Sequence, residues 1–334
     1  MENRKKIFLT GASGFLGSQV ALKLSRQGHH VIGLIRGDEL PSLLKGHSIE
    51  YCKGDILNPA SYDTVLKDCN VVVHTAAITS FGMKRTEDYY ETNTEGTKIL
   101  LKHSQANGIE RFIHTSTRGT LGVADVPEKS DETYGNKQTD EMDDYIKSKY
   151  LAEAEVIKYS QNGAMFCCIL SPTALVGACD QKPTPVGRII LSFLRGKVFV
   201  YMNGGINLID VEDVAQVFVE ALEKGENGQI YILGNENITL FRLFRELSMI
   251  SGIPLPKIKI PFQVAYTTSA MINGLSKVTG GSPFVTPAKI RSSYKRHSYC
   301  SSQKAIQAFG LFQAPIKVAL TKAVNWYRDH SNLL

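Results

Sequence analysis

The chain has 334 residues, of which 43% are hydrophobic and 21% charged, the composition of an ordinary globular protein with a large buried core. Its net charge is +6, and the basic residues are scattered apart from Arg4–Lys6 and Arg291–His297, so we do not expect a nucleic-acid-binding protein. No apolar run approaches the roughly 18 residues of a membrane helix, and the one behind the basic N-terminus is too short for a signal peptide.

Six cysteines occur, without a Cys-x-x-Cys pair or a spacing typical of zinc ligands, so no metal site is expected. Cys167 and Cys168 lie in an apolar run, where buried free thiols are common. Reduced thiols and no expected leader favour a cytoplasmic protein.

The first half of the chain alternates strand-like and helix-like segments, the pattern of a parallel sheet covered on both faces. The predicted strands are Lys6–Leu9, His30–Ile35, Ile49–Lys53, Val71–His74, Arg111–Thr115 and Met165–Leu170. The predicted helices are Phe15–Gln27, Ser61–Asp68, Tyr89–Asn107 and Glu141–Tyr159. We therefore predict an α/β fold with a doubly wound parallel sheet, of the Rossmann kind.

After about residue 171, prolines break this rhythm into shorter elements. Val211–Lys224 and Ile230–Leu233 are a predicted helix and strand that return to the sheet. Further helices, which predict a smaller and mostly helical C-terminal lobe, are expected near Leu240–Ser251, Ala288–Tyr294 and Ile316–His330.

A glycine-punctuated turn, Thr10–Gly17, stands between the apolar run Ile7–Leu9 and the helical stretch Ser18–Arg26. A strand, such a turn and a helix start are what a dinucleotide pyrophosphate needs, because backbone N–H groups and the positive helix end then face the phosphates. The spacing is G-x-x-G-x-x-G. Taken alone, the motif is also compatible with an ordinary glycine-rich turn.

Tyr145 and Lys149 stand four residues apart in a predicted helix, so their side chains share one face. A lysine ammonium close to a phenol would lower the tyrosine pKa from its usual value of about 10 and make it usable in general acid–base catalysis. Thr117 follows the fifth predicted strand, at the sheet edge where ligands bind. Taken alone, the spacing of Tyr145 and Lys149 is also compatible with chance on an exposed helix, and the Thr117 hydroxyl with a turn residue.

These residues and several others resemble the extended short-chain dehydrogenases/reductases, the NAD-dependent epimerase/dehydratase family, in the right order over nearly the whole chain. Besides the turn, the matching segments are Gly54–Ile56, His74–Ala77, Asn93–Thr97, Thr117, the Tyr145/Lys149 pair, Ser171–Gly177 and Asp210–Ala215. The resemblance implies that Thr117, Tyr145 and Lys149 are catalytic. It also implies a set of cofactor-binding residues, which comprises Gly11, Ser13, Gly14, Phe15, Leu16, Gly17, Arg36, Asp55, Ile56, Thr75, Ala76, Ala77, Asn93, Tyr145, Lys149 and Pro172.

Within the family, Thr117–Thr120 and Ser171–Gly177 look most like the dihydroflavonol-reductase-like group, which includes hopanoid-associated epimerase-like proteins. Dehydratases of the nucleotide-sugar branch carry an Asp-Glu pair where this chain has Arg118 and Gly119. Nucleotide-sugar enzymes also tend to place an arginine at the position of Ile206. Both departures favour a reductase that acts on an uncharged or weakly charged carbonyl.

Arg36 directly follows the second predicted strand, where an acidic residue would accept the ribose hydroxyls of NAD. An arginine there can bind the 2′-phosphate, so we expect NADP(H) rather than NAD(H). Asp38 is a competing signal, which we interpret as a turn residue with Gly37. The NADP-binding Rossmann domain would consist of residues 1–175 and of 206–234, which return to it. The substrate lobe would consist of residues 176–205 and 235–334.

The expected reaction is hydride transfer from NADPH to a small hydrophobic ketone or aldehyde, with Tyr145 as the proton donor. Phe81, Met83 and the loop Ala178–Gly187 are candidate substrate contacts, although the first two also fit core packing. The alternatives are a nucleotide-sugar epimerase with tightly bound NAD and a non-catalytic NADP-binding regulator. A homodimer could form through the helices Glu87–Gln105 and Glu141–Tyr159.

Overall fold

The computed structural model describes residues 4–38, 41–79, 85–122, 130–134, 143–163, 165–279 and 298–330. Within these ranges, seven strands form a central sheet in the order β10-β6-β5-β4-β1-β2-β3, with every neighbouring pair parallel. The strands are β1 (Lys6–Thr10), β2 (His30–Ile35), β3 (Ile49–Lys53), β4 (Val71–His74), β5 (Arg111–Thr115), β6 (Phe166–Pro172) and β10 (Ile230–Leu233). The predicted doubly wound α/β fold is confirmed.

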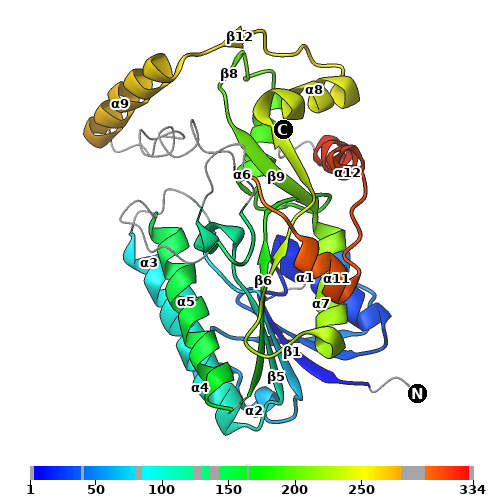
Figure 1. Ribbon diagram of the computed structural model, residues 1–334. Helices are drawn as coiled ribbons and strands as arrows, with labels where there is room; N and C mark the ends of the chain where they lie inside the picture. Colours follow the sequence, from blue (N-terminus) through cyan, green and yellow to red (C-terminus); the bar gives the residue numbers. More distant parts are fainter. Residues whose placement is uncertain are drawn as a thin grey trace.

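Helices cover both faces of this sheet (Figure 1). One face packs against α1 (Phe15–Arg26), α7 (Val211–Lys224) and α11 (Gln303–Phe309), and the other against α4 (Gly96–Ala106) and α5 (Asp144–Gln161). Because side chains alternate along a strand, Ile7 and Leu9 of β1 enter the first core and Phe8 the second. Burial on both faces explains why the strands other than the edge strand β3 are nearly continuous apolar runs.

A second, smaller lobe follows β6 and has its own apolar core. Its sheet has the order β11-β9-β7 and consists of β7 (Ala174–Val176), β9 (Gly205–Asp210) and β11 (Glu236–Thr239). Its other elements are α6 (Pro185–Leu194), β8 (Val200–Tyr201), α8 (Leu240–Ser251), β12 (Ile258–Lys259), α9 (Phe262–Thr279) and α12 (Ile316–Asp329). The predicted, mostly helical lobe thus also holds short strands, and residues 206–210 pair within its sheet.

Several predicted helices differ in their bounds. Tyr62 has φ −140° and ψ −9°, which separates the turn η2 (Pro59–Ser61) from α2 (Asp63–Leu66), so Ser61–Asp68 is not one helix. The stretch predicted as Tyr89–Asn107 is divided into α3 (Glu87–Tyr89), the π-helical segment η3 (Tyr90–Glu95) and α4. The remaining short turns are η1 (Ser42–Leu44) and η4 (Arg118–Leu121). The predicted helix Ala288–Tyr294 lies outside the described residues.

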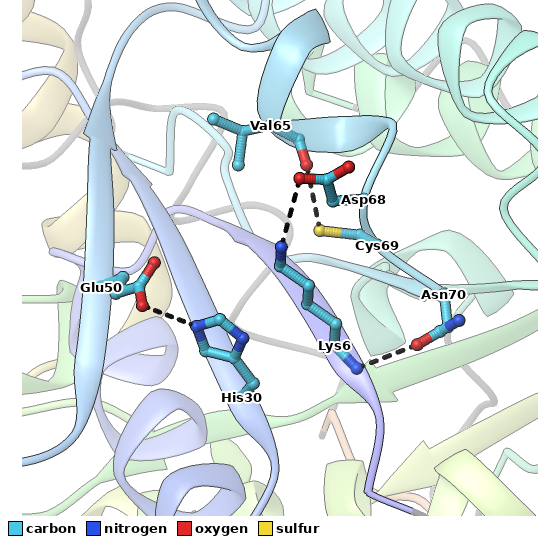
Figure 2. A network of polar contacts seen from close by, with 7 residues as sticks. All are labelled: Lys6, His30, Glu50, Val65, Asp68, Cys69 and Asn70. Atoms are coloured by element: carbon cyan, nitrogen blue, oxygen red, sulfur yellow. Dashed lines mark hydrogen bonds and ion pairs between the residues drawn. The ribbon is translucent and has the colours of Figure 1, made fainter.

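Polar contacts close the amino edge of the central sheet (Figure 2). The amide of Lys6, at the start of β1, donates to Asn70 Oδ1 at 3.0 Å, and its ammonium lies 3.4 Å from Asp68. At the start of β2, His30 Nε2 lies 2.8 Å from Glu50 Oε1. This edge is held by local structural contacts, which leaves the carboxyl edge as the place for ligand chemistry. None of the described helices combines the length and the hydrophobicity of a bilayer crossing.

Candidate active site

The glycine-rich turn follows β1 and lies where the strand order of the sheet reverses, between β1 and β4. Gly11 has φ +73°, and a Cβ placed there would lie 2.7 Å from the backbone nitrogen of Ala76. Gly14 precedes α1 without a side-chain cap. The first N–H groups of α1 therefore face the sheet edge without a protein side chain to bind them, which is the arrangement that an anion requires.

Gly17 is where the helix touches the turn. A Cβ at this position would lie 2.1 Å from the carbonyl oxygen of Gly11 and 2.7 Å from Thr75 Oγ1. We expect Gly17→Ala to lower the free energy of unfolding by about 1–3 kcal/mol or more, because backbone has to move. Urea unfolding monitored by circular dichroism measures this. Gly274→Ala, at a helical glycine of α9 with open space around it, is the control and should not destabilise.

A chain of hydrogen bonds fixes the two strands at this point. The Thr97 hydroxyl donates to the carbonyl oxygen of Asn93 at 2.6 Å and so accepts from His74 Nε2 at 3.0 Å. His74 Nδ1 then accepts from Thr10 Oγ1 at 2.7 Å, and Thr10 Oγ1 accepts from the amide of Ala76 at 3.2 Å. This network requires a neutral ring. Burial and the nearby Lys149 charge lower the pKa of His74 to about 3, which agrees with it.

Asn93 ties the π-helical segment to the helix of the tyrosine and the lysine. Its fully buried side chain accepts from the amide of Ile78 at 2.8 Å and donates to Ser148 Oγ at 3.0 Å. Thr94 donates to the backbone oxygen of Ser148 at 2.9 Å. Ser148 lies between Tyr145 and Lys149, so these bonds hold both residues in register with the loop after β4. A π-helical turn widens a helix locally and is frequent at functional sites.

The three residues predicted to be catalytic come together beyond the end of β5. Thr117 caps the start of η4, because its hydroxyl accepts from the amide of Gly119 at 3.3 Å. The same hydroxyl is hydrogen-bonded to the Tyr145 phenol. Tyr145 and Lys149 both belong to α5, whose first turn is capped by Asp143 through the amide of Ile146 at 2.9 Å. Two hydroxyl groups and an ammonium group thus converge at the sheet edge where ligand chemistry is expected.

The predicted lowering of the tyrosine pKa is wrong for this structure. The pKa of Tyr145 is raised to about 12, chiefly by burial and in part by Asp143 and Tyr89, while the hydrogen bond from Thr117 acts in the opposite direction. Lys149 does not offset these effects. Tyr145 is therefore a protonated phenol at neutral pH, which is the state of a proton donor.

Lys149 and Glu153 are a second buried pair, four residues apart on α5 and 2% and 1% exposed. Burial lowers the pKa of Lys149 to about 8, which the carboxylate of Glu153 partly counteracts. Burial raises the pKa of Glu153. The Thr120 hydroxyl lies 3.1 Å from Glu153 Oε2 and 2.9 Å from the carbonyl oxygen of Thr117, so Glu153 also supports the turn that carries Thr117.

Sequence reasoning missed Glu153 and the structural role of Arg118. Glu153 could have been found, because it follows Lys149 at the same i, i+4 spacing that identified Tyr145. Arg118 is 5% exposed and donates to Ser130 Oγ and to the carbonyl oxygen of Tyr299, the latter at 3.2 Å. It thereby fixes the end of β5 to a segment 181 residues away, a contact that local sequence patterns cannot predict.

Comparisons with known proteins agree with this architecture. A model of the NAD dependent epimerase/dehydratase family matches residues 7–234, more than half of the chain. A putative dihydroflavonol 4-reductase of Synechocystis sp. is 36% identical over 327 residues, covering 97% of this chain and 94% of that protein. The chain belongs to the NAD-dependent epimerase/dehydratase family. It is accordingly an NAD(P)-dependent oxidoreductase of the extended short-chain dehydrogenase/reductase type.

Two further proteins are similar over nearly the whole length of this chain. Sterol demethylase protein B of Methylococcus capsulatus is 27% identical over 327 residues, covering 96% of this chain and 98% of that protein. The crystal structure of gox2253 superposes with a TM-score of 0.86 at 33% identity and covers 98% of this chain and 99% of that one.

The residues present fit the dinucleotide that the epimerase/dehydratase family implies. Gly11 and Gly17 let the turn pack closely against Thr75 and Ala76, because a Cβ at either position would collide there or with the turn itself, and α1 begins without a side-chain cap. The buried ammonium of Lys149 makes no hydrogen bond to any residue that the structure describes, so its donors are available to a ligand. Across the described ranges, no three His, Cys, Asp or Glu side chains gather as metal ligands.

The remaining predicted cofactor residues lie along the same edge of this family fold. Asp55 accepts from the amide of Leu57 at 2.9 Å, and the neighbouring Ile56 packs against Gly96 of α4. Pro172 ends β6 beside Leu233. A pocket in front of the turn is lined by Ser13, Gly14, Phe15, Ser18, Pro41, Leu43, Cys179, Gln181 and Lys182.

The loop Ala178–Gly187 therefore begins beside the glycine-rich turn, on the side expected for the cofactor. Asp180 anchors it: this 2% exposed carboxylate accepts from the amide of Thr184 and from the Tyr327 hydroxyl, both at 2.9 Å. Its role toward a substrate stays a prediction. Phe81 and Met83 lie outside the described residues.

Proposed function

We propose that this protein is an NADPH-dependent reductase of a small hydrophobic ketone or aldehyde, with Tyr145 as the general acid. The observation that carries the proposal is the hydrogen-bonded pair of Thr117 and Tyr145 beside the buried Lys149. Two hydroxyl groups directed at one point can bind a carbonyl oxygen together. The relatives named above for a dihydroflavonol and a sterol support an apolar substrate.

In this mechanism Thr117 donates a hydrogen bond to the substrate oxygen, and Tyr145 donates a hydrogen bond and then its proton. NADPH, when bound, supplies the hydride. Lys149 would hold the nicotinamide ribose and favour the phenolate that remains after proton transfer. Holding the reactants in place contributes much of the acceleration, since well-oriented groups can contribute roughly 7–11 kcal/mol.

The second-strand terminus supports NADP(H) over NAD(H). Arg36 is exposed just beyond β2, where the ribose of a bound dinucleotide would lie. Asp38, the competing acidic residue, forms an ion pair with Lys53 at the end of β3. Its charge is thus compensated within the protein, while Arg36 remains to bind a phosphate bidentately.

We expect Arg36→Ala to raise the Kd for NADPH about 10- to 100-fold, because a hydrogen-bonded charge pair is lost, and to leave the Kd for NADH nearly unchanged. Titration of intrinsic fluorescence with each cofactor measures both constants. Arg26→Ala, at the far end of α1, is the control. An equal loss for both cofactors would contradict the assignment of Arg36 to the 2′-phosphate.

The reaction itself is tested by following NADPH absorbance with a panel of apolar ketones and aldehydes, with NADH in parallel. Nucleotide sugars form a third arm, because an epimerase would interconvert them with tightly held NAD and without net cofactor consumption. We expect NADPH oxidation with apolar carbonyls only. Release of NAD from the denatured purified protein, together with epimerisation, would instead identify the nucleotide-sugar activity.

With Arg118, Gly119 and Ile206, this chain lacks the elimination pair and the diphosphate-binding arginine that are typical of the nucleotide-sugar branch. The structure adds a physical reason: Arg118 is buried and bound to Ser130 and Tyr299, so it is committed to the fold. A homodimer through the helices around α4 and α5, and a cytoplasmic location, stay predictions.

A further inference from the structure

Charge is divided unevenly along this chain. Between Glu246 and Asp329 there is no acidic residue, and this stretch carries 11 lysines and arginines, a net charge of +11. The rest of the chain has 27 basic and 32 acidic residues, a net charge of −5. The basic residues of this stretch are mostly not clustered in sequence, so the asymmetry arises from the absence of Asp and Glu. Such an asymmetry is typical of a surface that meets a polyanion.

Exposed apolar side chains gather in the same part of the chain. Next to the small sheet of β8 and β12, Phe199, which directly precedes β8, is 71% exposed, and Ile258 of β12 is 62% exposed. The strands are parallel, with Ile258 opposite Val200. We name the exposed large apolar side chains of β8, β12 and α9, together with Phe199 directly before β8, the docking surface, which comprises Phe199, Val200, Ile258, Val264, Met271 and Ile272.

Helix α9 continues this surface. Val264 and Met271 are exposed and stand seven residues apart, two turns along one side of the helix. Among the described side chains of α9, only the small Ala265 and Ser269 are buried. In Figure 1, α9 stands apart from α6 and α8 at the end of the lobe that also holds β8 and β12.

Basic side chains are interleaved with the apolar ones. Lys197 precedes β8, and Lys257 and Lys259 flank Ile258, so cations and apolar groups share one sheet edge. All three are exposed, and none forms an ion pair with a residue that the structure describes. Uncompensated lysines beside exposed phenylalanine and isoleucine are the composition of surfaces that lie in the headgroup region of anionic membranes.

We propose that the docking surface binds the protein reversibly to the surface of an anionic lipid bilayer, with Phe199, Ile258 and α9 entering the headgroup region. The exposed apolar groups argue against a nucleic acid as the partner of this surface, because phosphate binding needs no exposed isoleucine or methionine. The lysines decide against self-association, because two copies of this surface would bring like charges together.

The test is co-sedimentation of the full chain with vesicles of phosphatidylcholine alone and of phosphatidylcholine with phosphatidylglycerol in equal parts. We expect binding to the anionic vesicles only, weakened by salt because screening shortens the reach of the charges. Lys257→Glu/Lys259→Glu should lower the partition coefficient about 30-fold or more, since each basic residue near an anionic surface contributes on the order of fivefold. Phe199→Ser/Ile258→Ser should weaken binding as well.

Matched controls distinguish the effect of the docking surface from the effect of the protein's net charge. Lys67→Glu/Lys102→Glu makes the same charge change beside α2 and on α4, at the opposite end of the molecule (Figure 1), and should bind like the wild type. Phe312→Ser removes a 69% exposed phenylalanine outside the surface and should also have no effect. Cofactor titration of every variant confirms folding.

Three results would overturn the proposal. The first is equal binding of neutral and anionic vesicles, and the second is an equal loss in both charge-reversal variants. The third is no vesicle binding at all. In that case, binding of a single-stranded RNA by the same lysines would identify a nucleic acid as the partner, and dissociation of a dimer by the apolar substitutions, seen in sedimentation, would identify a second copy of the chain. None of these readouts uses catalysis, so the outcome is independent of the proposed reductase activity.

Discussion

Replacing Tyr145 with phenylalanine is expected to lower kcat for carbonyl reduction by about 10²–10⁴-fold, the usual contribution of a positioned general acid. The phenylalanine ring keeps the contact with Tyr89, whose ring centroid lies 6.2 Å away, but it has no proton to give. Single-turnover measurements with NADPH and an apolar ketone give the rate of the chemical step, and fluorescence titration gives the Kd for NADPH, which should not rise.

Tyr150→Phe is the matched control, because Tyr150 lies on the same helix outside the predicted site. It should leave kcat unchanged. Thr117→Val is the companion variant, since it removes the hydroxyl that is hydrogen-bonded to Tyr145. Wild-type turnover in the Tyr145→Phe protein would mean that another group supplies the proton, and the assignment of Tyr145 would have to be abandoned.

Local sequence patterns were sufficient for the central sheet. Apart from the largely exposed edge strand β3, its strands are short apolar runs buried on both faces, so their positions could be read from hydrophobicity. All seven strands were predicted to within two residues at either end. The glycine-rich turn was equally accessible. Gly11 needs a positive φ and a close approach to Ala76, and both requirements restrict the residue type itself.

The smaller lobe was harder, because its elements depend on partners far along the chain. The strand β9 pairs with both β7 and β11, and each of these outer strands has only three or four residues. Strands this short carry no periodicity that distinguishes them from loops. The π-helical segment was likewise missed, since its hydrogen bonds to Ile78 and Ser148 decide the local backbone.

The candidate site divides in the same way. Residue types and spacing singled out the side chains that we propose carry the chemistry, and the structure brings Thr117, Tyr145 and Lys149 to one end of the sheet. Spacing could not predict the protonation behaviour. Whether Lys149 lowers the pKa of Tyr145 depends on burial and on neighbours such as Asp143, which only the tertiary structure supplies.

Lys149→Met is expected to abolish most of the activity and yet raise the free energy of unfolding by about 1–3 kcal/mol at pH 7. The lysine is 2% exposed, and its pKa of about 8 lies below the ordinary value of 10.5, so folding at neutral pH places a charge where the protein disfavours it. Methionine fills similar space without a charge. Urea unfolding at pH 7, with NADPH oxidation as the activity assay, measures both effects.

The sign of the pH dependence follows from the same two values. Between pH 8 and 10.5 the unfolded chain keeps the proton of Lys149 while the folded protein releases it, so the unfolded state binds more protons. The contribution of Lys149 to the free energy of unfolding therefore rises with pH in this window and is lost as the pH falls through 8. The difference between wild type and Lys149→Met should shrink from pH 7 to 10.5.

Two further variants make this test specific. Lys147→Met removes an exposed lysine of the same helix and should change neither the activity nor the pH dependence. Glu153→Gln removes the carboxylate that raises the pKa of Lys149, so the stability difference should begin to shrink below pH 8 rather than at it. A pH-independent difference between wild type and Lys149→Met would show that the ammonium of Lys149 is not held in a costly environment. The link between its burial and its function would then fail.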